Sequence, residues 1–432
     1  MAVTAWTGAE VRAMRTAALR ITQADLAERL GFTESVVRKW EKRGATITLT
    51  NQHAAAMDTL LARLDDGQRH RFESARSAVS PTIVPDVGQF DRSDAIVGRL
   101  HQLAELRGDG DLVDGLSLAL GEVVDRYEAE GPRHLAGEVQ ELRQRVNLLL
   151  QQRRHPAHVE QLYRIAARLS GVLAYMAVNC GRFGSARMYC REAQVLASLI
   201  EDREMLAWVK STESFCAYYA GDFALSVTLA EEGISLADSG SQAIRLYSNG
   251  LARAWGKLGD TVEVERAIEQ AMSLADHHNV VPGLTPALTF ESYGKARLMA
   301  NAATAFLSAG RFDKALEFGE LVEDHVSQSD SVWSATLVRL DVATALVLQR
   351  HPEVERAVRL GVEALDASSD RPIRSVWQRA DELGALLESR HRVPSRVYAE
   401  RLAQWRRSAQ PLIAPESRIQ PPSASTARVV QR

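Results

Sequence analysis

The sequence predicts an all-α fold with a small N-terminal helical globule and a long body of helical hairpins. Three observations support this. Alanine and leucine dominate the composition and favour helices. No segment sustains the apolar–polar alternation of a half-buried strand. A unit of helix, short glycine turn and helix recurs through the middle of the chain. At 432 residues, the chain is also too long for one small domain.

Charge is distributed unevenly along the chain. The net charge is −3 overall, but residues 1–64 carry +3 and the remainder carries −6. A basic head on an acidic body suits an anionic partner for the head alone. The start lacks the apolar run of a signal peptide, and the apolar stretch at 169–180 is too short to span a bilayer. The three cysteines form no metal-ligand pattern. We expect a cytoplasmic protein with no membrane contact, cofactor or metal.

The first helices of the head are marked by their caps. Residues 9–20 carry apolar side chains at helical spacing. Thr22 then offers an N-cap oxygen, and Asp25 three residues later completes a capping box. The second helix ends at Gly31, because glycine enters the left-handed region without steric cost. Two helices are therefore predicted here, the first over residues 9–20 and the second from the cap at Thr22 to Gly31.

A third and a fourth helix complete the head. Thr33 is the expected N-cap of the third helix, whose inner face carries Val37 and Trp40. Gly44 ends that helix, and residues 51–64 supply a closing amphipathic helix. These short helices predict a small globule.

The remaining boundaries follow from composition. The head is expected at 1–64, and the polar, proline-broken stretch 65–95 is expected to be a linker. Residues 96–407 read as almost continuous helix. The tail, 408–432, is rich in Pro, Ser and Arg and is expected to be disordered.

Internal repeats predict the architecture of the body. The segments YMAVNCGRFGSARMY, FCAYYAGDFALSVTL, RAWGKLGDTVEVERA and TAFLSAGRFDKALEF turn at Gly181, Gly221, Gly259 and Gly310, and a fifth unit turns at Pro352. The glycines are 40, 38 and 51 residues apart, longer than the tetratricopeptide period. We interpret the units as degenerate tetratricopeptide-like repeats, which stack into a right-handed solenoid with a concave, helix-lined face.

The stretch TQADLAERLGFTESVVRKWEKRG resembles the phage-repressor or Xre-type helix-turn-helix. The residues that carry this resemblance are Thr22-Gln23, Leu26-Ala27, Gly31, Val37 and Trp40-Glu41. The whole chain resembles actinobacterial Xre-type regulators with a tetratricopeptide-like body and, more distantly, the peptide-responsive RRNPP-type regulators. The resemblance implies a sequence-specific DNA-binding regulator whose body senses an effector or dimerises.

Carried onto this sequence, the resemblance assigns residues to DNA. In that fold the third helix enters the major groove and the second crosses the phosphate backbone. Arg38 is expected to donate two bonds to a guanine. Glu34 can accept from cytosine N4, or can weaken binding as an acid near phosphates. The expected DNA-binding residues are Gln23, Thr33, Glu34, Ser35, Arg38, Lys39, Lys42 and Arg43.

Two side chains of the head have distinct expected roles. Gln23, at the start of the second helix, suits a phosphate, since its amide and the helix N-terminus both offer donors. Glu41 is expected to form an ion pair with Arg12 or Arg15 in preference to contacting DNA. Lys42 and Arg43 are expected at the phosphate backbone.

The repeat pattern places nine side chains on the concave face. They are Tyr175, Ser211, Phe215, Tyr218, Asn249, Arg253, Arg297, Thr304 and Arg339. Asn249 could bond to the main chain of an extended peptide, and an arginine could hold a carboxylate in fork geometry. The competing interpretation is that the aromatic side chains pack in the core and the arginines lie on solvated faces.

Three function classes are left open by these patterns. The preferred one is a transcriptional regulator that binds double-stranded DNA as a homodimer and responds to a peptide or small-molecule effector. The second is a protein-interaction adaptor with a vestigial helix-turn-helix. An enzyme is not expected: GLARAWGKLG has the wrong glycine spacing for a phosphate-binding loop, and no nucleophile motif stands in a strand–turn context.

Overall fold

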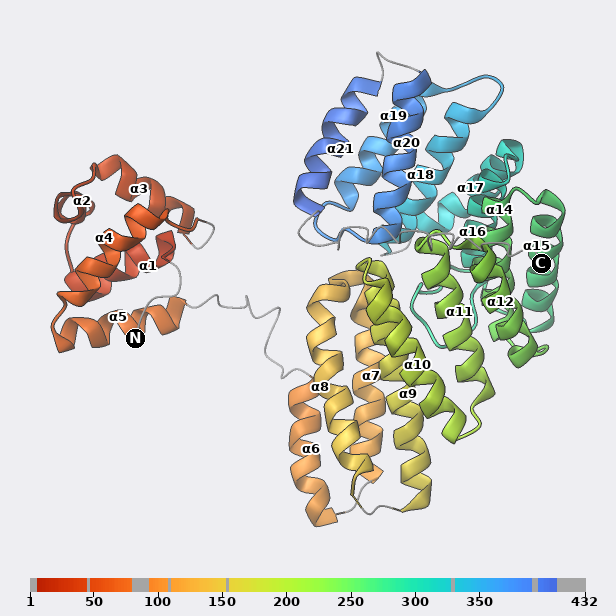
Figure 1. Ribbon diagram of the computed structural model, residues 1–432, viewed down its shortest axis with the longest axis horizontal. Coiled ribbons are helices and arrows are strands. Elements are labelled where there is room, and N and C mark those ends of the chain that lie inside the picture. The colour runs from red at the N-terminus through yellow and green to blue at the C-terminus, as the bar shows by residue number, and fades with distance from the viewer. Residues whose placement is uncertain are drawn as a thin grey trace, which may run out of the picture. The chain divides into compact units, whose positions relative to one another are not determined.

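The computed structural model shows an all-helical protein, as predicted. It describes residues 6–44, 47–79, 93–107, 110–152, 155–327, 331–390 and 395–409. Within these ranges, pairing of strand type is confined to one isolated antiparallel bridge between Thr7 and Thr48. The chain divides into two compact units, 1–91 and 92–432, which we call the head and the body (Figure 1). The predicted tail from residue 410 onward lies outside the described residues.

The head surrounds one apolar core. Its elements are α1 (Gly8–Ala13), the π-helical η1 (Met14–Leu19), α2 (Gln23–Leu30), α3 (Glu34–Arg43), α4 (Asn51–Ala62) and α5 (Asp66–Val79). The start of α1 crosses α3 closely at Gly8, where a Cβ would lie 1.9 Å from the Trp40 carbonyl oxygen. The helix that we predicted over residues 9–20 consists of α1 followed by η1, so an α-helix continues there as a π-helix.

The predicted caps of α2 are confirmed. Thr22 Oγ1 accepts from the Asp25 amide at 3.2 Å, and the Asp25 carboxylate accepts from the Thr22 amide at 3.0 Å. Gly31 follows α2 with φ of 74°. Thr33 does occupy the N-cap position of α3, but its side chain caps no amide. Its hydroxyl instead pairs with that of Ser35 at 2.9 Å, which corrects our expectation for the Thr33 side chain.

The predicted linker 65–95 is wrong in its first half. Residues 66–79 form α5, which packs on the head. Phe72 is buried and stacks on Trp6 with 5.6 Å between ring centroids. Arg71 donates to the carbonyl oxygens of Ala17 and Ala18, each at 3.1 Å. We did not predict this helix, because one buried aromatic residue among polar neighbours makes a weak amphipathic pattern.

The body is a succession of helices, most of which pack against their neighbours in sequence (Figure 1). They are α6 (Ser93–Arg107), α7 (Gly110–Glu130), α8 (Pro132–Leu150), α9 (Pro156–Asn179), α10 (Phe183–Leu199), α11 (Arg203–Tyr219), α12 (Phe223–Ala237), α13 (Gln242–Arg245), the π-helical η3 (Leu246–Ala252), α14 (Arg253–Leu258), α15 (Thr261–His277), α16 (Lys295–Ser308), α17 (Phe312–Ser327), α18 (Val332–Leu348), α19 (Val354–Ala367), α20 (Arg374–Arg390) and α21 (Ser395–Ala409).

The turn glycines do what the repeat pattern predicts. Gly181, Gly221, Gly259 and Gly310 have φ between 71° and 86°, so each sits in the left-handed region at the end of a helix. The small residues beside the turns let the paired helices approach closely. Ser214 and Ser226, for example, are fully buried and bond to each other across the α11–α12 hairpin at 2.9 Å.

An inserted segment, 279–294, accounts for the longest repeat spacing. It connects α15 to α16 without helix and lies against the helices of the body; we call it the strap. Side chains of α7, α11, α13 and α16 bind its main chain. The bonds are Trp208 Nε1 to Thr289 O at 2.7 Å, Arg245 to Thr289 O at 3.1 Å, Gln242 to Phe290 O at 2.7 Å, Arg297 to Thr285 O at 2.6 Å and Ala287 N to Glu128 at 2.6 Å.

The last helices of the body contact its early ones. Trp333 of α18 lies edge-on to Tyr127 of α7, with 5.3 Å between ring centroids. Arg371, just before α20, donates to the Glu128 carbonyl oxygen at 3.2 Å. Gln378 of α20 donates to the Tyr219 carbonyl oxygen at 3.1 Å. The succession of helices therefore closes on itself.

Replacing Phe72 with alanine should destabilise the head by about 3–5 kcal/mol, because a buried aromatic side chain is lost from its core. His70, which is exposed on the same helix, provides the matched control, and His70→Ala should change stability by less than about 0.5 kcal/mol. Hydrogen exchange of the full chain, followed by mass spectrometry, measures head and body separately. Equal protection of α1–α4 in both variants would mean that α5 is not part of the head.

Candidate functional site

The exposed face of α3 carries most of the side chains predicted to contact DNA. Val37 and Trp40 are buried in the head core. Thr33, Glu34, Ser35, Arg38, Lys39, Lys42 and Arg43 are exposed. Four of these seven carry a positive charge, so the face is cationic. The structure therefore brings the predicted α3 residues together on one surface.

Arg38 is paired on that surface. Its guanidinium forms an i,i+4 ion pair with Glu34, and the two side chains are 65% and 46% exposed. An exposed pair of this kind is worth only about 0.3–0.5 kcal/mol. A guanine contact, worth about 1–3 kcal/mol, can therefore replace it. Glu34 thus orients Arg38 in the free protein, a role that we did not predict.

Behind this face lies a buried polar network. Glu41 accepts two bonds from Arg15, at 2.6 and 2.8 Å, which confirms one of the two expected ion pairs. Gln23 Nε2 also donates to Glu41, at 2.7 Å. In this structure Glu41 therefore holds the amide group that we assigned to a phosphate, and the phosphate contact stays a prediction. The negative charge of the buried Glu41 carboxylate strengthens this hydrogen bond, which explains why the Gln23 amide binds there.

The same network sets the pKa of Glu41. Burial alone would raise it, but hydrogen bonds from Arg15 and Gln23 and the positive charge of Arg15 and Arg12 outweigh burial. The net pKa of Glu41 therefore lies below its usual range. Glu41 is a structural anion that joins α3 to η1 and α2.

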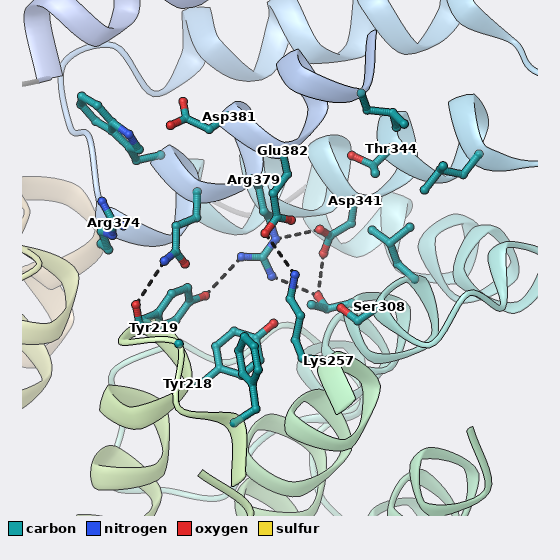
Figure 2. A pocket seen from close by; sticks show the side chains of 18 of the residues that line it. Tyr218, Tyr219, Lys257, Ser308, Asp341, Thr344, Arg374, Arg379, Asp381 and Glu382 are labelled. Carbon is teal, nitrogen blue, oxygen red and sulfur yellow. Dashed lines mark hydrogen bonds and ion pairs between the residues drawn. The ribbon is translucent and has the colours of Figure 1, made fainter. Parts of the chain in front are cut away.

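The body contains a cavity of about 960 Å³ between its middle and last helices (Figure 2). Its apolar wall includes Tyr218, Phe223 and Trp377. Its rim carries two ion pairs, Lys257–Glu382 at 3.1 Å and Arg406–Asp381 at 2.6 Å. We call this space the outer cavity. Its size is that of a typical small-molecule site.

A buried cluster forms the inner end of the outer cavity. Tyr219 Oη accepts from Arg253 at 2.8 Å and from Arg379 at 3.2 Å. Arg379 also forms an ion pair with Asp341 at 2.7 Å and donates to Thr304 at 3.2 Å, and Thr304 donates to Asp341 at 2.6 Å (Figure 2). We call these five residues the Tyr219 cluster. It joins α11, α14, α16, α18 and α20.

The cluster lowers the pKa of Tyr219. Burial by itself would raise that pKa. The charges and hydrogen bonds of Arg253 and Arg379 outweigh burial, so the phenol titrates below its ordinary value. In contrast, burial raises the pKa of Tyr127, Tyr175 and Tyr398.

A second space, the inner chamber, lies behind the cluster and has a volume of about 70 Å³. Tyr219, Thr304, Asp341 and Arg379 line both spaces, so the two spaces meet at these side chains. The chamber also gathers six predicted concave-face residues, namely Tyr175, Phe215, Asn249, Arg253, Arg297 and Thr304. Tyr218 lines the outer cavity.

Two of these residues lie in or next to the π-helical segment η3. Asn249 lies within η3 and Arg253 directly follows it. Asn249 Oδ1 accepts from Arg253, whose guanidinium lies 4.3 Å from the centre of the Tyr218 ring. Isolated π-helical turns are frequent at functional sites, because the wider turn redirects side chains.

Three of the predicted concave-face residues have other contacts or positions in the structure. Arg297 donates to Thr285 O of the strap at 2.6 Å and to Ser334 of α18 at 2.7 Å, so its guanidinium is already engaged. Arg339 lines neither space and pairs with Glu323 at 3.9 Å, since its position on α18 points it toward α17. Ser211 is buried and lines neither space.

Sequence reasoning missed Asp341, Arg379, Tyr219 and Trp377. Asp341 had a signal, as a lone acid within the apolar run of α18. Tyr219 stands next to the predicted Tyr218. Arg379 and Trp377 had none, because α20 lies outside the four glycine-turn repeats, and only the closure of the body brings it to α11.

Comparisons with known proteins add no assignment. No protein-family model matches the chain, and no curated protein matches it significantly.

The described residues contain neither a membrane-spanning helix nor a cluster of metal ligands. Within the described ranges, no helix combines the length and apolar character needed to cross a membrane. No group of three or more His, Cys, Asp or Glu side chains among those residues is placed to hold a metal ion.

Burial raises the pKa of the Cys216 thiol to about 11.

Replacing Glu41 with glutamine should reduce the stability of the head by about 1.5–3 kcal/mol at neutral pH, because hydrogen bonds to a charged group are lost. Since the folded pKa is lowered, this contribution is complete above the unfolded pKa and disappears as pH falls through the folded pKa. Hydrogen exchange of the head at several pH values measures the difference. A difference that does not shrink in acid would contradict the assignment.

Replacing Tyr219 with phenylalanine should remove an early-titrating phenol. The ultraviolet absorbance of phenolate, followed in an alkaline titration of the native protein, should lose one of its earliest steps. Because the folded pKa lies below the unfolded value of about 10, ionisation of Tyr219 stabilises the fold increasingly as pH rises toward that value. The stability deficit of Tyr219→Phe should therefore grow with pH. Loss of a late step instead would refute the lowered pKa.

Proposed function

We propose that the protein is a sequence-specific DNA-binding transcriptional regulator of the Xre type. In this proposal the head is a helix-turn-helix domain and the body is a tetratricopeptide-like solenoid. The body binds an effector and holds a homodimer, so that two heads meet two half-sites of an operator. The protein acts in the cytoplasm and is not an enzyme.

One observation carries this proposal: the cationic, exposed face of α3. It stands on a helix whose other face is buried through Val37 and Trp40, and it follows α2 after a glycine in the left-handed region. A rigid helix with cationic side chains on one face is the geometry that reads a major groove. Arg38, Lys39, Lys42 and Arg43 supply the charge that phosphates and bases require.

The body supports the second half of the proposal. It contains a cavity large enough for a small effector, and that cavity lies where the middle and last helices of the body meet. A ligand there would contact both the middle helices, such as α11 and α14, and the last helices, α18 and α20. Binding can therefore shift the arrangement of the body, and a coupling free energy of about 1–3 kcal/mol suffices to change operator occupancy.

Replacing Arg38 with alanine should weaken binding to the operator by about 1–3 kcal/mol and weaken binding to a random duplex much less, because a base contact is lost. The operator is first selected from a random duplex library. Fluorescence anisotropy then measures both affinities as a function of salt.

Arg63, an exposed arginine at the end of α4, provides a control of equal charge. Arg63→Ala should change the two affinities alike and only slightly. If Arg38→Ala weakened both duplexes equally, Arg38 would contact phosphate only. If the wild-type protein bound no duplex at any salt concentration, the regulator proposal would fail and the adaptor would take its place.

A further inference from the structure

We propose that the outer cavity and inner chamber form one binding site for a small acid: an apolar or aromatic body in the cavity, with its carboxylate or similar anionic group at the Tyr219 cluster. The proposal deepens the proposed function by assigning the chemical class of the effector. It rests on that function only in calling the ligand an effector.

Buried positive charge is the first argument. Arg253, Arg297 and Arg379 line the chamber and are at most 9% exposed. Asp341 faces Arg379 at 2.7 Å, and Glu128 faces Arg297 at 3.5 Å. Arg253 has no carboxylate partner among the described residues. A buried cation without a counter-charge is costly, so the site favours a ligand that brings a negative charge.

Unused donors are the second argument. The Tyr219 hydroxyl accepts two bonds, and none of the residues that the structure describes accepts its proton. Arg253 Nε and Asn301 Nδ2 are buried and likewise have no acceptor within the described ranges. Both oxygens of Asp341 are already engaged. The wall therefore offers three donors and calls for a ligand that accepts hydrogen bonds.

Size separates the two parts of the ligand. A chamber of about 70 Å³ holds a group the size of a carboxylate, whereas about 960 Å³ holds a drug-sized body. Tyr218, Phe223 and Trp377 give that body aromatic surfaces. The Arg253 guanidinium lies over the Tyr218 ring, 4.3 Å from its centre, in a cation–π contact.

The closure of the body argues for a small ligand. An extended peptide along the inner helices would collide with the strap, which already occupies the donors of Trp208, Gln242 and Arg297. Contacts between α7 and α18 and between α11 and α20 close the remaining path. The outer cavity then accepts a small acid, or at most a few residues at the carboxyl end of a peptide.

The test uses the full chain and two probes with the same aromatic framework. One is 8-anilinonaphthalene-1-sulfonate, which carries an anionic group, and the other is the neutral N-phenyl-1-naphthylamine. Fluorescence titration should show one saturable site for the anionic probe and at least tenfold weaker binding of the neutral probe. Equal affinity for the two probes would overturn the proposal.

Variants locate the anionic group. Arg253→Met and Tyr219→Phe should each weaken the anionic probe about tenfold and leave the neutral probe unchanged. Arg339→Met is the matched control, since Arg339 is an arginine of the body that lines neither space, and it should bind both probes as the wild type does. Tyr219→Phe preserves the ring, so it keeps the test valid if Arg253→Met fails to fold by circular dichroism. Wild-type affinity in Tyr219→Phe would overturn the site.

Competition identifies the source of the acid. Displacement of the probe by 4-phenylbutyrate, but not by its amide, supports a free small acid. Displacement only by a phenylalanine-terminated tetrapeptide acid, and not by its amide, places a peptide carboxyl end in the same site. Displacement by the amides as well would overturn the anionic requirement. Arg38→Ala should leave all these affinities unchanged, so failure of DNA binding and failure of this site are separable.

Discussion

The body depends on the hydroxyl group of Tyr219, which is shared by two buried guanidinium groups. Arg253 comes from the helix after the π-helical segment η3, and Arg379 comes from α20, 160 residues away from Tyr219. Without this shared acceptor, each arginine would leave a buried donor unsatisfied, and such donors cost about 1–3 kcal/mol each. The cluster therefore constrains where the last helices lie relative to the middle ones, and both spaces take their shape from that constraint.

The strap works in the same direction. Its carbonyl oxygens accept hydrogen bonds from side chains on three helices, α11, α13 and α16. Where the non-helical backbone is buried, as at Leu288 and Thr289, it must find such partners, because buried peptide groups are almost always hydrogen-bonded. The strap and the inner helices thus satisfy each other. Ala287 and Tyr293 of the strap also line the small inner chamber.

The head follows the same logic on a smaller scale. Glu41 is an anion whose role is internal, since Arg15 and Gln23 both donate to it. That network holds α2 against α3 and leaves the opposite face of α3 to solvent. The exposed Glu34–Arg38 pair is weak, so a stronger partner can displace it. In the proposed function, this exposed face of α3 is the one that would enter the major groove.

The sequence by itself determined the local features of this protein. These are the caps of α2, the glycine turns, the buried face of α3 and the all-helical fold. They follow from interactions between residues a few positions apart, and such interactions can be predicted from the sequence. What the tertiary structure alone decided is long-range: the packing of α5 on Trp6, the capture of Gln23 by Glu41, the strap, and the meeting of Tyr219 with Arg379. A buried charge pairs with a group that lies near it in space. Local sequence patterns do not show which residues, far apart in the chain, will be brought together by the fold.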